Sequence, residues 1–197
     1  TDQRFLPDSQ RLGIESLLDG NRFEVECDLQ GIYQRLNVPT ALTALDVLNG
    51  SGGLRIAPQD VRRGFASAAR ATGLRGRWER PFVVCDTGHN ESGIAEVAAQ
   101  IARQTYRKLY MVVGFVEDKD LSRVLPLLPR QAHYVFTKAG IRRALDEREL
   151  ARRAAGYGLQ GECVPTVNEA LARARELAGP EDMIFIGGST YVVAEVL

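Results

Sequence analysis

The sequence has no apolar run of the roughly 20 residues that a membrane-spanning helix needs, and no charged-then-apolar signal opens it. It has only 3 cysteines, none in CxxC spacing, which excludes a disulfide framework and a paired-cysteine zinc site. Lys plus Arg and Asp plus Glu each number 25, so no net charge draws the chain toward nucleic acid or an anionic membrane. We therefore expect a cytoplasmic protein with buried cysteines and with neither nucleic acid nor membrane as a partner.

Several catalytic signatures are also missing. The sequence contains no G-x-x-x-x-G-K-[ST], no H-E-x-x-H and no G-x-S-x-G. GYGLQG (156–161) fits G-x-G-x-x-G, but it ends a helical pattern and precedes a strand pattern, the reverse of the dinucleotide fingerprint. The chain therefore has no phosphate-cradling loop of its own.

What the sequence does contain is the composition of a packed globular protein, 45% apolar and 25% charged. From Pro81 onward, short runs of Val, Ile and Phe alternate with helical patterns, which predicts a Rossmann-like, mostly parallel sheet with helices on both faces. The predicted strands are 81–86, 109–115, 133–137, 161–166 and 183–188. The predicted helices are 94–104, 121–128 with Asp120 as N-cap, 145–158, 170–178 and 190–197.

The first 80 residues follow another pattern. They contain one predicted strand, 23–29, and two predicted helices, 38–50 and 58–70, and one strand with two helices cannot close its own core. Because the chain also starts at Thr1 without an initiator Met, we expect a piece of a longer protein with exposed apolar surface. The predicted organisation is a domain remnant over 1–72, a linker over 73–79 and an α/β domain over 80–197.

In an open parallel sheet, ligands bind outside the carboxyl ends of the strands. This rule selects the segments 86–90, 115–120, 137–140 and 187–190. Asp86 could bind a ribose hydroxyl or a metal-bound water, and the Gly-Gly-Ser turn before Thr190 could offer N–H groups to an anion. Each has a plainer interpretation: Asp86 as a turn residue, 118–120 as a solvated charge run, and Ser189 as only the N-cap of the last helix.

Several motifs together resemble one family. They are LRGRWE (74–79), CDTGHN (85–90), GFVEDKD (114–120) and GGSTYVVAEVL (187–197), preceded by DLQGIYQRLNVPTALTAL (28–45). In this order they resemble the C-terminal portion of folylpolyglutamate synthase/dihydrofolate synthase, a member of the Mur ligase superfamily, with residues 1–72 as the end of its central ATPase domain.

The resemblance implies an ATP-dependent ligase that joins L-glutamate to folate or dihydropteroate through an acyl phosphate. It implies ATP contacts for Asn37, Arg77 and Asp86. Residues around the incoming glutamate or the cleft would be His89, Asn90, Lys119 and Ser189. The Mg²⁺ ligands, the P-loop and all catalytic residues would lie upstream of Thr1, so this chain should be inactive alone, and the complete enzyme should be a monomer.

Two other interpretations stay open. One is a fragment of a UDP-muramoyl amino-acid ligase, which shares the D-x-x-H-N pattern but acts on cell-wall precursors. The other is a non-catalytic α/β module that binds a nucleotide or nothing, in which the strand-end residues would be scattered instead of convergent. The pterin and UDP-sugar sites both lie in upstream sequence, which would discriminate between the two ligases.

Overall fold

The structure is a computed structural model that describes residues 1–6, 9–15, 22–52, 55–74 and 83–197. The chain divides into two compact units, Thr1–Arg75 and Gly76–Leu197. Most of the predicted linker, 73–79, lies outside the described residues. Within the described ranges, no helix has the length and apolar character to cross a lipid bilayer.

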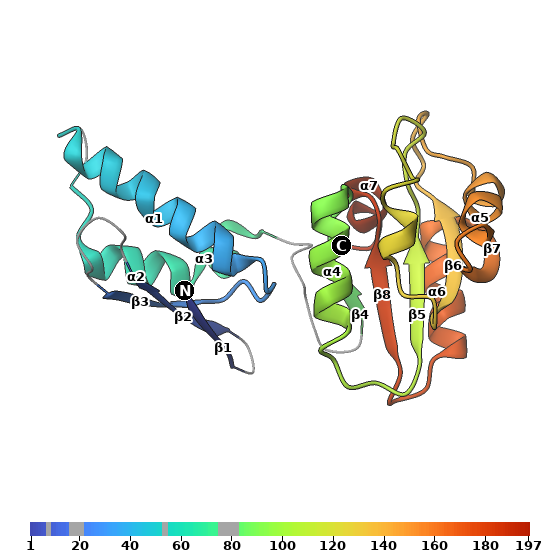
Figure 1. The fold of residues 1–197 in the computed structure, drawn as a ribbon, viewed down its shortest axis with the longest axis horizontal. Coiled ribbons are helices and arrows are strands. Elements are labelled where there is room, and N and C mark those ends of the chain that lie inside the picture. The colour runs from blue at the N-terminus through green and yellow to red at the C-terminus, as the bar shows by residue number, and fades with distance from the viewer. Residues whose placement is uncertain (7–8, 16–21, 53–54, 75–82) are drawn as a thin grey trace. The chain divides into compact units, whose positions relative to one another are not determined.

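The second unit contains a parallel sheet, five-stranded in its described part. Its strands are β4 (Val83–Cys85), β5 (Leu109–Val113), β6 (His133–Lys138), β7 (Gln160–Thr166) and β8 (Met183–Gly187). Their spatial order is β4-β8-β5-β6-β7, so the last strand of the chain lies between the first two (Figure 1). The predicted fold class, a mostly parallel α/β sheet, is confirmed.

Apolar side chains bury both faces of this sheet, because successive residues of a strand point to opposite sides. Met111 and Phe185 belong to a cluster with α4 (Glu91–Ile101), the 3-10 turn η1 (Leu125–Leu127) and α5 (Glu147–Ala155). Their neighbours Val112 and Ile186 belong to a second cluster with α6 (Val167–Leu177) and α7 (Thr190–Ala194). Continuous apolar strands such as β5 are the sequence signature of a sheet covered in this way.

One predicted helix of this unit is wrong. Residues 121–128 form only the short turn η1, because Pro126 has no N–H to donate and Pro129 forces Leu128 into extended backbone, with ψ at 145°. Asp120 therefore caps no helix. Its carboxylate accepts hydrogen bonds from the backbone N–H and the hydroxyl of Ser122, at 3.1 and 2.6 Å.

The first unit contains a three-stranded antiparallel sheet of β1 (Asp2–Phe5), β2 (Gln10–Glu15) and β3 (Arg22–Cys27). The sequence predicted only β3. The alternation of β2 is concealed because Gln10 occupies a fully buried position, where its amide donates to the Gly31 carbonyl at 3.1 Å. The hydrogen bond allows a polar side chain to be buried here. In the sequence, however, this glutamine interrupts the apolar alternation by which a strand is recognised.

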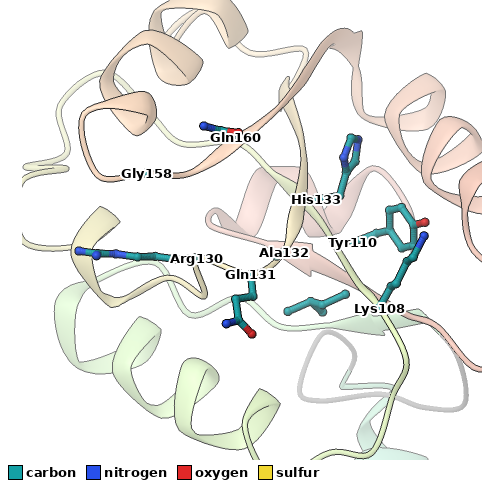
Figure 2. A pocket seen from close by; sticks show the side chains of 9 residues that line it. Lys108, Tyr110, Arg130, Gln131, Ala132, His133, Gly158 and Gln160 are labelled. Atoms are coloured by element: carbon teal, nitrogen blue, oxygen red, sulfur yellow. The ribbon is translucent and has the colours of Figure 1, made fainter.

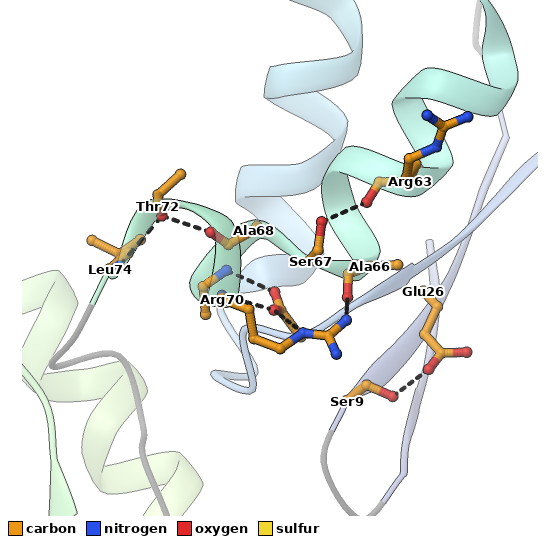
Figure 3. Close-up of polar contacts among 11 residues, drawn as sticks. Ser9, Glu26, Arg63, Ala66, Ser67, Ala68, Arg70, Thr72 and Leu74 are labelled. Atoms are coloured by element: carbon orange, nitrogen blue, oxygen red, sulfur yellow. Dashed lines mark hydrogen bonds and ion pairs between the residues drawn. The ribbon is translucent and has the colours of Figure 1, made fainter.

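Three helices follow β3: α1 (Gln34–Gly50), α2 (Pro58–Ala66) and α3 (Ala68–Thr72). The Asp28 carboxylate accepts hydrogen bonds from the first backbone N–H groups of α3, at 2.9 Å from Ala69 and 3.2 Å from Arg70. Figure 3 shows the junction of α2 and α3, where the Ser67 hydroxyl donates to the Arg63 carbonyl at 2.9 Å. These contacts fix the two short helices beside the end of β3.

The first unit has a small core of its own, which corrects the expectation that these residues could not close one. The core members come from one face of the sheet and from α1: Leu12, Ile14, Val25, Cys27 and Val38. The expected exposed apolar surface is present as well, because α1 leaves Leu36 57% and Val47 68% exposed. The prediction that all cysteines are buried holds for Cys27 and Cys85 but is wrong for Cys163, which lies exposed on β7.

Candidate functional site

The carboxyl ends of β4, β8 and β5 lie side by side. After β4 the chain continues into α4 on one face of the sheet, and after β8 it continues into α7 on the other face. Open α/β sheets bind ligands at the point where the connections that follow two neighbouring strands run to opposite faces of the sheet. The segments selected from sequence, 86–90 and 187–190, therefore meet at the part of the edge where a ligand is expected.

Glycines let these strand-end loops approach one another through their backbones. The N–H of Asp86 donates to the Ile186 carbonyl at 3.1 Å, and the N–H of Gly114 donates to the Gly187 carbonyl at 3.3 Å. A Cβ at Gly187 would lie 2.8 Å from the Asp86 carbonyl oxygen, and one at Gly188, where φ is +87°, would lie 2.9 Å from the Gly114 oxygen. Side chains at these positions would separate the loops, so the glycines keep the edge compact.

Asp86 comes directly after β4 and is only 3% exposed. One carboxylate oxygen accepts the N–H of Gly88 at 2.7 Å. This hydrogen bond closes a turn, as expected if Asp86 acts as a turn residue. Three residues after Asp86, Nδ1 of the half-buried His89 lies 2.9 Å from the Thr87 carbonyl oxygen. The loop from Asp86 to His89 is therefore held in shape by its own short hydrogen bonds.

Asn90 and Ser189 begin two helices at this edge. The Asn90 side chain accepts the N–H of Gly93 at 2.8 Å and caps α4, while the buried Ser189 hydroxyl accepts the N–H of Tyr191 at 3.2 Å and caps α7. The N-cap interpretation of Ser189 is thus confirmed. Both caps direct the N-terminal ends of their helices, with their partial positive charge, toward the strand-end loops.

Lys119 lies in the loop after β5, half-buried, and its ammonium group has no hydrogen-bond or ion-pair partner among the residues that the structure describes. The next residue, Asp120, is held by Ser122, whose hydroxyl and then backbone N–H lower the pKa of the Asp120 carboxyl. Lys119 is therefore a cation whose charge no described residue neutralises directly.

Arg143 connects this loop to α7, and no sequence pattern pointed to it. Its guanidinium lies 3.7 Å from the Asp118 carboxylate and donates to the Tyr191 hydroxyl at 2.7 Å. Its backbone carbonyl accepts the N–H of Glu117 at 2.9 Å. Arg143 thereby links the loop that carries Lys119 to the helix that begins after Ser189, although these segments are far apart in the sequence.

Lys138, another residue from the selected segments, has a structural role at the end of β6. Its ammonium group lies 3.1 Å from Asp146 and 3.0 Å from the buried carboxylate of Glu147. The side chains of Glu147 and then Asp146 raise the pKa of Lys138. This ion cluster fixes the start of α5 against β6.

The remaining predicted ATP contacts lie elsewhere in the chain. Asn37 lies exposed on α1 of the first unit, where its amide donates to the Gln34 side chain at 3.2 Å. Arg77 lies outside the described residues. The geometry of the second unit therefore unites Asp86, His89, Asn90 and Ser189 at one edge, with Lys119 on the adjacent loop.

With a parallel sheet, a glycine-lined edge and two helices capped at its strand ends, the second unit belongs to the class of open α/β domains, whose members bind ligands at this edge. The chain is a member of the Mur ligase family: the family model described as "Mur ligase, glutamate ligase domain" matches residues 73–190.

Within that family, its relatives are named folylpolyglutamate synthases. A probable bifunctional folylpolyglutamate synthase/dihydropteroate synthase of Haloferax volcanii is 32% identical over 189 residues, which is 94% of this chain and 22% of the relative. The Mycobacterium tuberculosis folylpolyglutamate synthase complexed with ADP is 28% identical with a TM-score of 0.80, over 99% of this chain and 45% of that one.

A third relative is a bifunctional folylpolyglutamate synthase/dihydrofolate synthase solved with Mn, AMPPNP and L-glutamate bound. It is 25% identical with a TM-score of 0.66, over 78% of this chain and 37% of that one. The chain thus spans less than half the length of each of these three proteins.

Proposed function

We propose that this chain is the C-terminal part of an ATP-dependent ligase that adds L-glutamate to folate, to dihydropteroate, or to both. The observation that carries the proposal is the likeness to the ADP-bound mycobacterial folylpolyglutamate synthase, which extends over both units, 99% of the chain, at a TM-score of 0.80. Similarity confined to the second unit would have supported only the glutamate ligase domain. The coverage of 45% of that protein supports the view that the chain is a part of a longer enzyme.

In this proposal Asn37, Arg77 and Asp86 contact ATP, which supplies the phosphoryl group that activates the acceptor carboxylate. A guanidinium such as that of Arg77 offers a planar fork of donors to phosphate oxygens. The Asp86 carboxylate accepts the N–H of Gly88 through one oxygen, and a ribose hydroxyl is a donor that suits a carboxylate. Residues 73–79 would then form the linker between a remnant of the ATPase domain and the glutamate ligase domain.

The strand-end edge would take the glutamate. Lys119 offers to a carboxylate an ammonium group that no described residue pairs with, and His89 lies half-buried between the Asp86 turn and the start of α4. Asn90 and Ser189 would act chiefly through the helix ends that they cap, because their side-chain oxygens already accept backbone N–H groups. Positioning and charge stabilisation are the main contributions that a protein makes to phosphoryl and acyl transfer.

The relative solved with Mn and AMPPNP raises the question of a metal site in this chain. Among the described residues, no three His, Cys, Asp or Glu side chains gather closely enough to hold a metal ion. The donor set of the described residues thus does not fit a Mg²⁺ centre, and we assign no step of the reaction to a metal held by them. The proposal places the metal ligands and the P-loop in sequence upstream of Thr1.

The test is an assay of ADP release by this 197-residue chain and by the complete gene product that contains it. Each protein is given ATP, Mg²⁺ and L-glutamate with one acceptor at a time: folate, dihydropteroate or a UDP-muramoyl peptide precursor. We expect release from the complete product with one or both pteridine acceptors, dependent on glutamate. The chain alone should release none.

Three outcomes would contradict the proposal. Release with the UDP-muramoyl acceptor alone would favour the cell-wall ligase. Absence of release with every acceptor, from a complete product that gives a cooperative thermal melt, would favour a non-catalytic module. Release at an enzyme-like rate by the isolated chain would show that the phosphate-binding machinery lies within these residues.

A further inference from the structure

Basic side chains are arranged differently at the two edges of the parallel sheet. At the edge where β5, β6 and β7 begin, Figure 2 shows Lys108 and Arg130 directed away from each other. At the opposite edge, the guanidinium of Arg143 contacts two other segments of the chain, at Asp118 and at Tyr191. Arg143 therefore connects the elements that follow two neighbouring strands, β5 and β8.

The segment that carries Arg143 is paired through its backbone with the loop after β5. An antiparallel bridge joins the two segments. On its two sides, the N–H of Glu117 donates to the Arg143 carbonyl and the N–H of Leu145 donates to the Phe115 carbonyl, both at 2.9 Å. The loop after β5 therefore has a fixed register against this segment, and the register ends two residues before Lys119.

The same segment is held to α7 at both ends of that helix. The Tyr191 hydroxyl accepts a hydrogen bond from the Arg143 guanidinium at 2.7 Å, and the Arg143 Cζ lies 5.2 Å from the centre of the Tyr191 ring. One turn later, the Glu195 carboxylate accepts the N–H of Gly140 at 2.6 Å. Residues four apart lie on one face of a helix, so Tyr191 and Glu195 together fasten α7 to this segment.

We propose that Arg143 and Tyr191 are positioning residues, whose contact fixes the loop that carries Lys119 relative to the helix that begins after Ser189. This inference rests on the proposed function, in which Lys119 and Ser189 border the glutamate. The Arg143 guanidinium is directed to Asp118 and Tyr191, so it acts through the elements that it holds. A misplacement of about 1 Å, caused far from the chemistry, can strongly impair a reaction, so such a contact can control glutamate use.

The contact should add little to the stability of the fold. Arg143, Asp118 and Tyr191 are all exposed, and exposed polar pairs contribute little to the free energy of unfolding. The packing of α7 on the sheet depends instead on Val192 and Val193, both 1% exposed. Substitutions at Arg143 and Tyr191 should therefore leave the thermal melt unchanged, so that an effect on glutamate use would report position and not unfolding.

The first measurement records backbone amide chemical shifts of this 197-residue chain and requires no activity. Tyr191→Phe removes the hydroxyl and keeps the ring. We expect the amide signals of Asp118 and Lys119 to move together with those of α7. Arg142→Gln is the matched control, because it removes the neighbouring exposed cation, which has no hydrogen bond or ion pair with the described residues, and it should leave the Lys119 signal in place. Shifts confined to α7 and the loop after β6 in Tyr191→Phe would overturn the proposal.

The second measurement is the steady-state kinetics of the complete gene product, with L-glutamate and ATP varied in turn. Tyr191→Phe and Arg143→Gln should each raise the KM for glutamate about fivefold, as the loss of one hydrogen bond does, and should change kcat and the KM for ATP by less than about twofold. Arg143→Lys keeps a charge and a donor and should recover most of the loss. Arg142→Gln should match the parent enzyme.

An unchanged KM for glutamate in both Tyr191→Phe and Arg143→Gln would overturn the proposal. A rise in Arg143→Gln alone would also overturn it, because it would indicate that the guanidinium contacts glutamate directly and does not act through Tyr191. A complete product without glutamate-dependent ADP release would contradict the proposed function instead. In that case the amide shifts of this chain would still decide whether the pair holds the loop that carries Lys119.

Discussion

The two units of the chain differ in how completely they bury their secondary structure. The sheet of the second unit is covered on both faces, and Met111, Val112, Phe185 and Ile186 are all fully buried at its centre. The sheet of the first unit is covered on one face only, and Val47 of its longest described helix is 68% exposed. The comparison indicates that the second unit has a complete hydrophobic core on both sides of its sheet, whereas the first unit is stabilised by a much smaller core on one side of its sheet.

The largest expected effect lies in the second unit. Phe185→Ala removes a fully buried ring from the centre of the sheet and should lower the free energy of unfolding of that unit by about 3–5 kcal/mol. The matched control in the first unit is Phe5→Ala, whose ring is 41% exposed and should cost much less. Hydrogen exchange of the strand amides reports each unit separately, which matters because two units need not unfold together. Equal losses in both would contradict the comparison.

The next effect concerns the close approach of the strand-end loops. A Cβ at Gly114 would lie 2.5 Å from the Thr137 carbonyl oxygen, so Gly114→Ala should destabilise the second unit by about 1–3 kcal/mol. At Gly140 the nearest atom to an added Cβ is the flexible Glu195 carboxylate at 3.6 Å. Gly140→Ala should therefore be nearly neutral, and urea melts of the two variants measure the difference. Equal urea midpoints for the two variants would show that the close approach of the loops does not require a glycine at position 114.

A third prediction concerns acid stability. Buried Asp182 accepts hydrogen bonds from the Arg107 side chain and from the N–H of Gly179, and these two, Arg107 first, hold the pKa of its carboxyl below the usual value. The resulting stability is complete above the unfolded pKa of about 3.9 and is lost as pH falls through the lower folded value. Asp182→Asn should therefore lower the urea midpoint most at pH 6 and progressively less below about pH 4.

The control for this acid dependence is Asp118→Asn, at an exposed pair with Arg143. Exposed ion pairs contribute little, so this change should leave the urea midpoint nearly unchanged at every pH. A loss in Asp182→Asn that stayed constant from pH 6 to pH 3 would show that packing, and not the charge, is what the substitution removes.

The smallest effect on stability is expected on the exposed side of α1. Val47→Lys should change the free energy of unfolding by no more than about 0.5 kcal/mol, because the side chain is already largely in solvent. It should nevertheless reduce concentration-dependent association of the chain in sedimentation velocity, because it interrupts exposed apolar surface. Thr40→Lys adds the same charge to α1 without removing an apolar side chain. Equal reductions by both would assign the effect to charge alone.

The same difference between the units explains how much of the fold the sequence predicts. Strands such as Leu109–Val113 and Met183–Gly187 are unbroken apolar runs, because both sides of them are buried. The strands Asp2–Phe5 and Gln10–Glu15 belong to a sheet with one solvent-facing side and a buried glutamine, so no apolar run marks them. The helix predicted over 121–128 is wrong because the prediction relied on the helical spacing of apolar residues and gave too little weight to Pro126 and Pro129.

The candidate site was predictable to the extent that it follows from topology. Segments after parallel strands must share one edge, so the placement of Asp86 and Ser189 at that edge followed from the alternation of strands and helices, without any knowledge of contacts. Arg143 was not predictable, because its importance comes from meeting Asp118 and Tyr191 across large sequence separations. No local pattern encodes such a tertiary contact.

The central claim is that the edge after β4 belongs to the nucleotide and glutamate site of a ligase, and substitution of Asp86 and Arg77 tests it most directly. In the complete gene product, Asp86→Asn should raise the KM for ATP while the thermal melt stays unchanged. Arg77→Ala should impair ATP use more than Arg77→Lys, because lysine keeps a charge that can meet a phosphate oxygen, and a charge-assisted hydrogen bond contributes about 1.5–3 kcal/mol. An unchanged ATP dependence in folded Asp86→Asn and Arg77→Ala proteins would contradict the claim and leave these two residues as turn and linker.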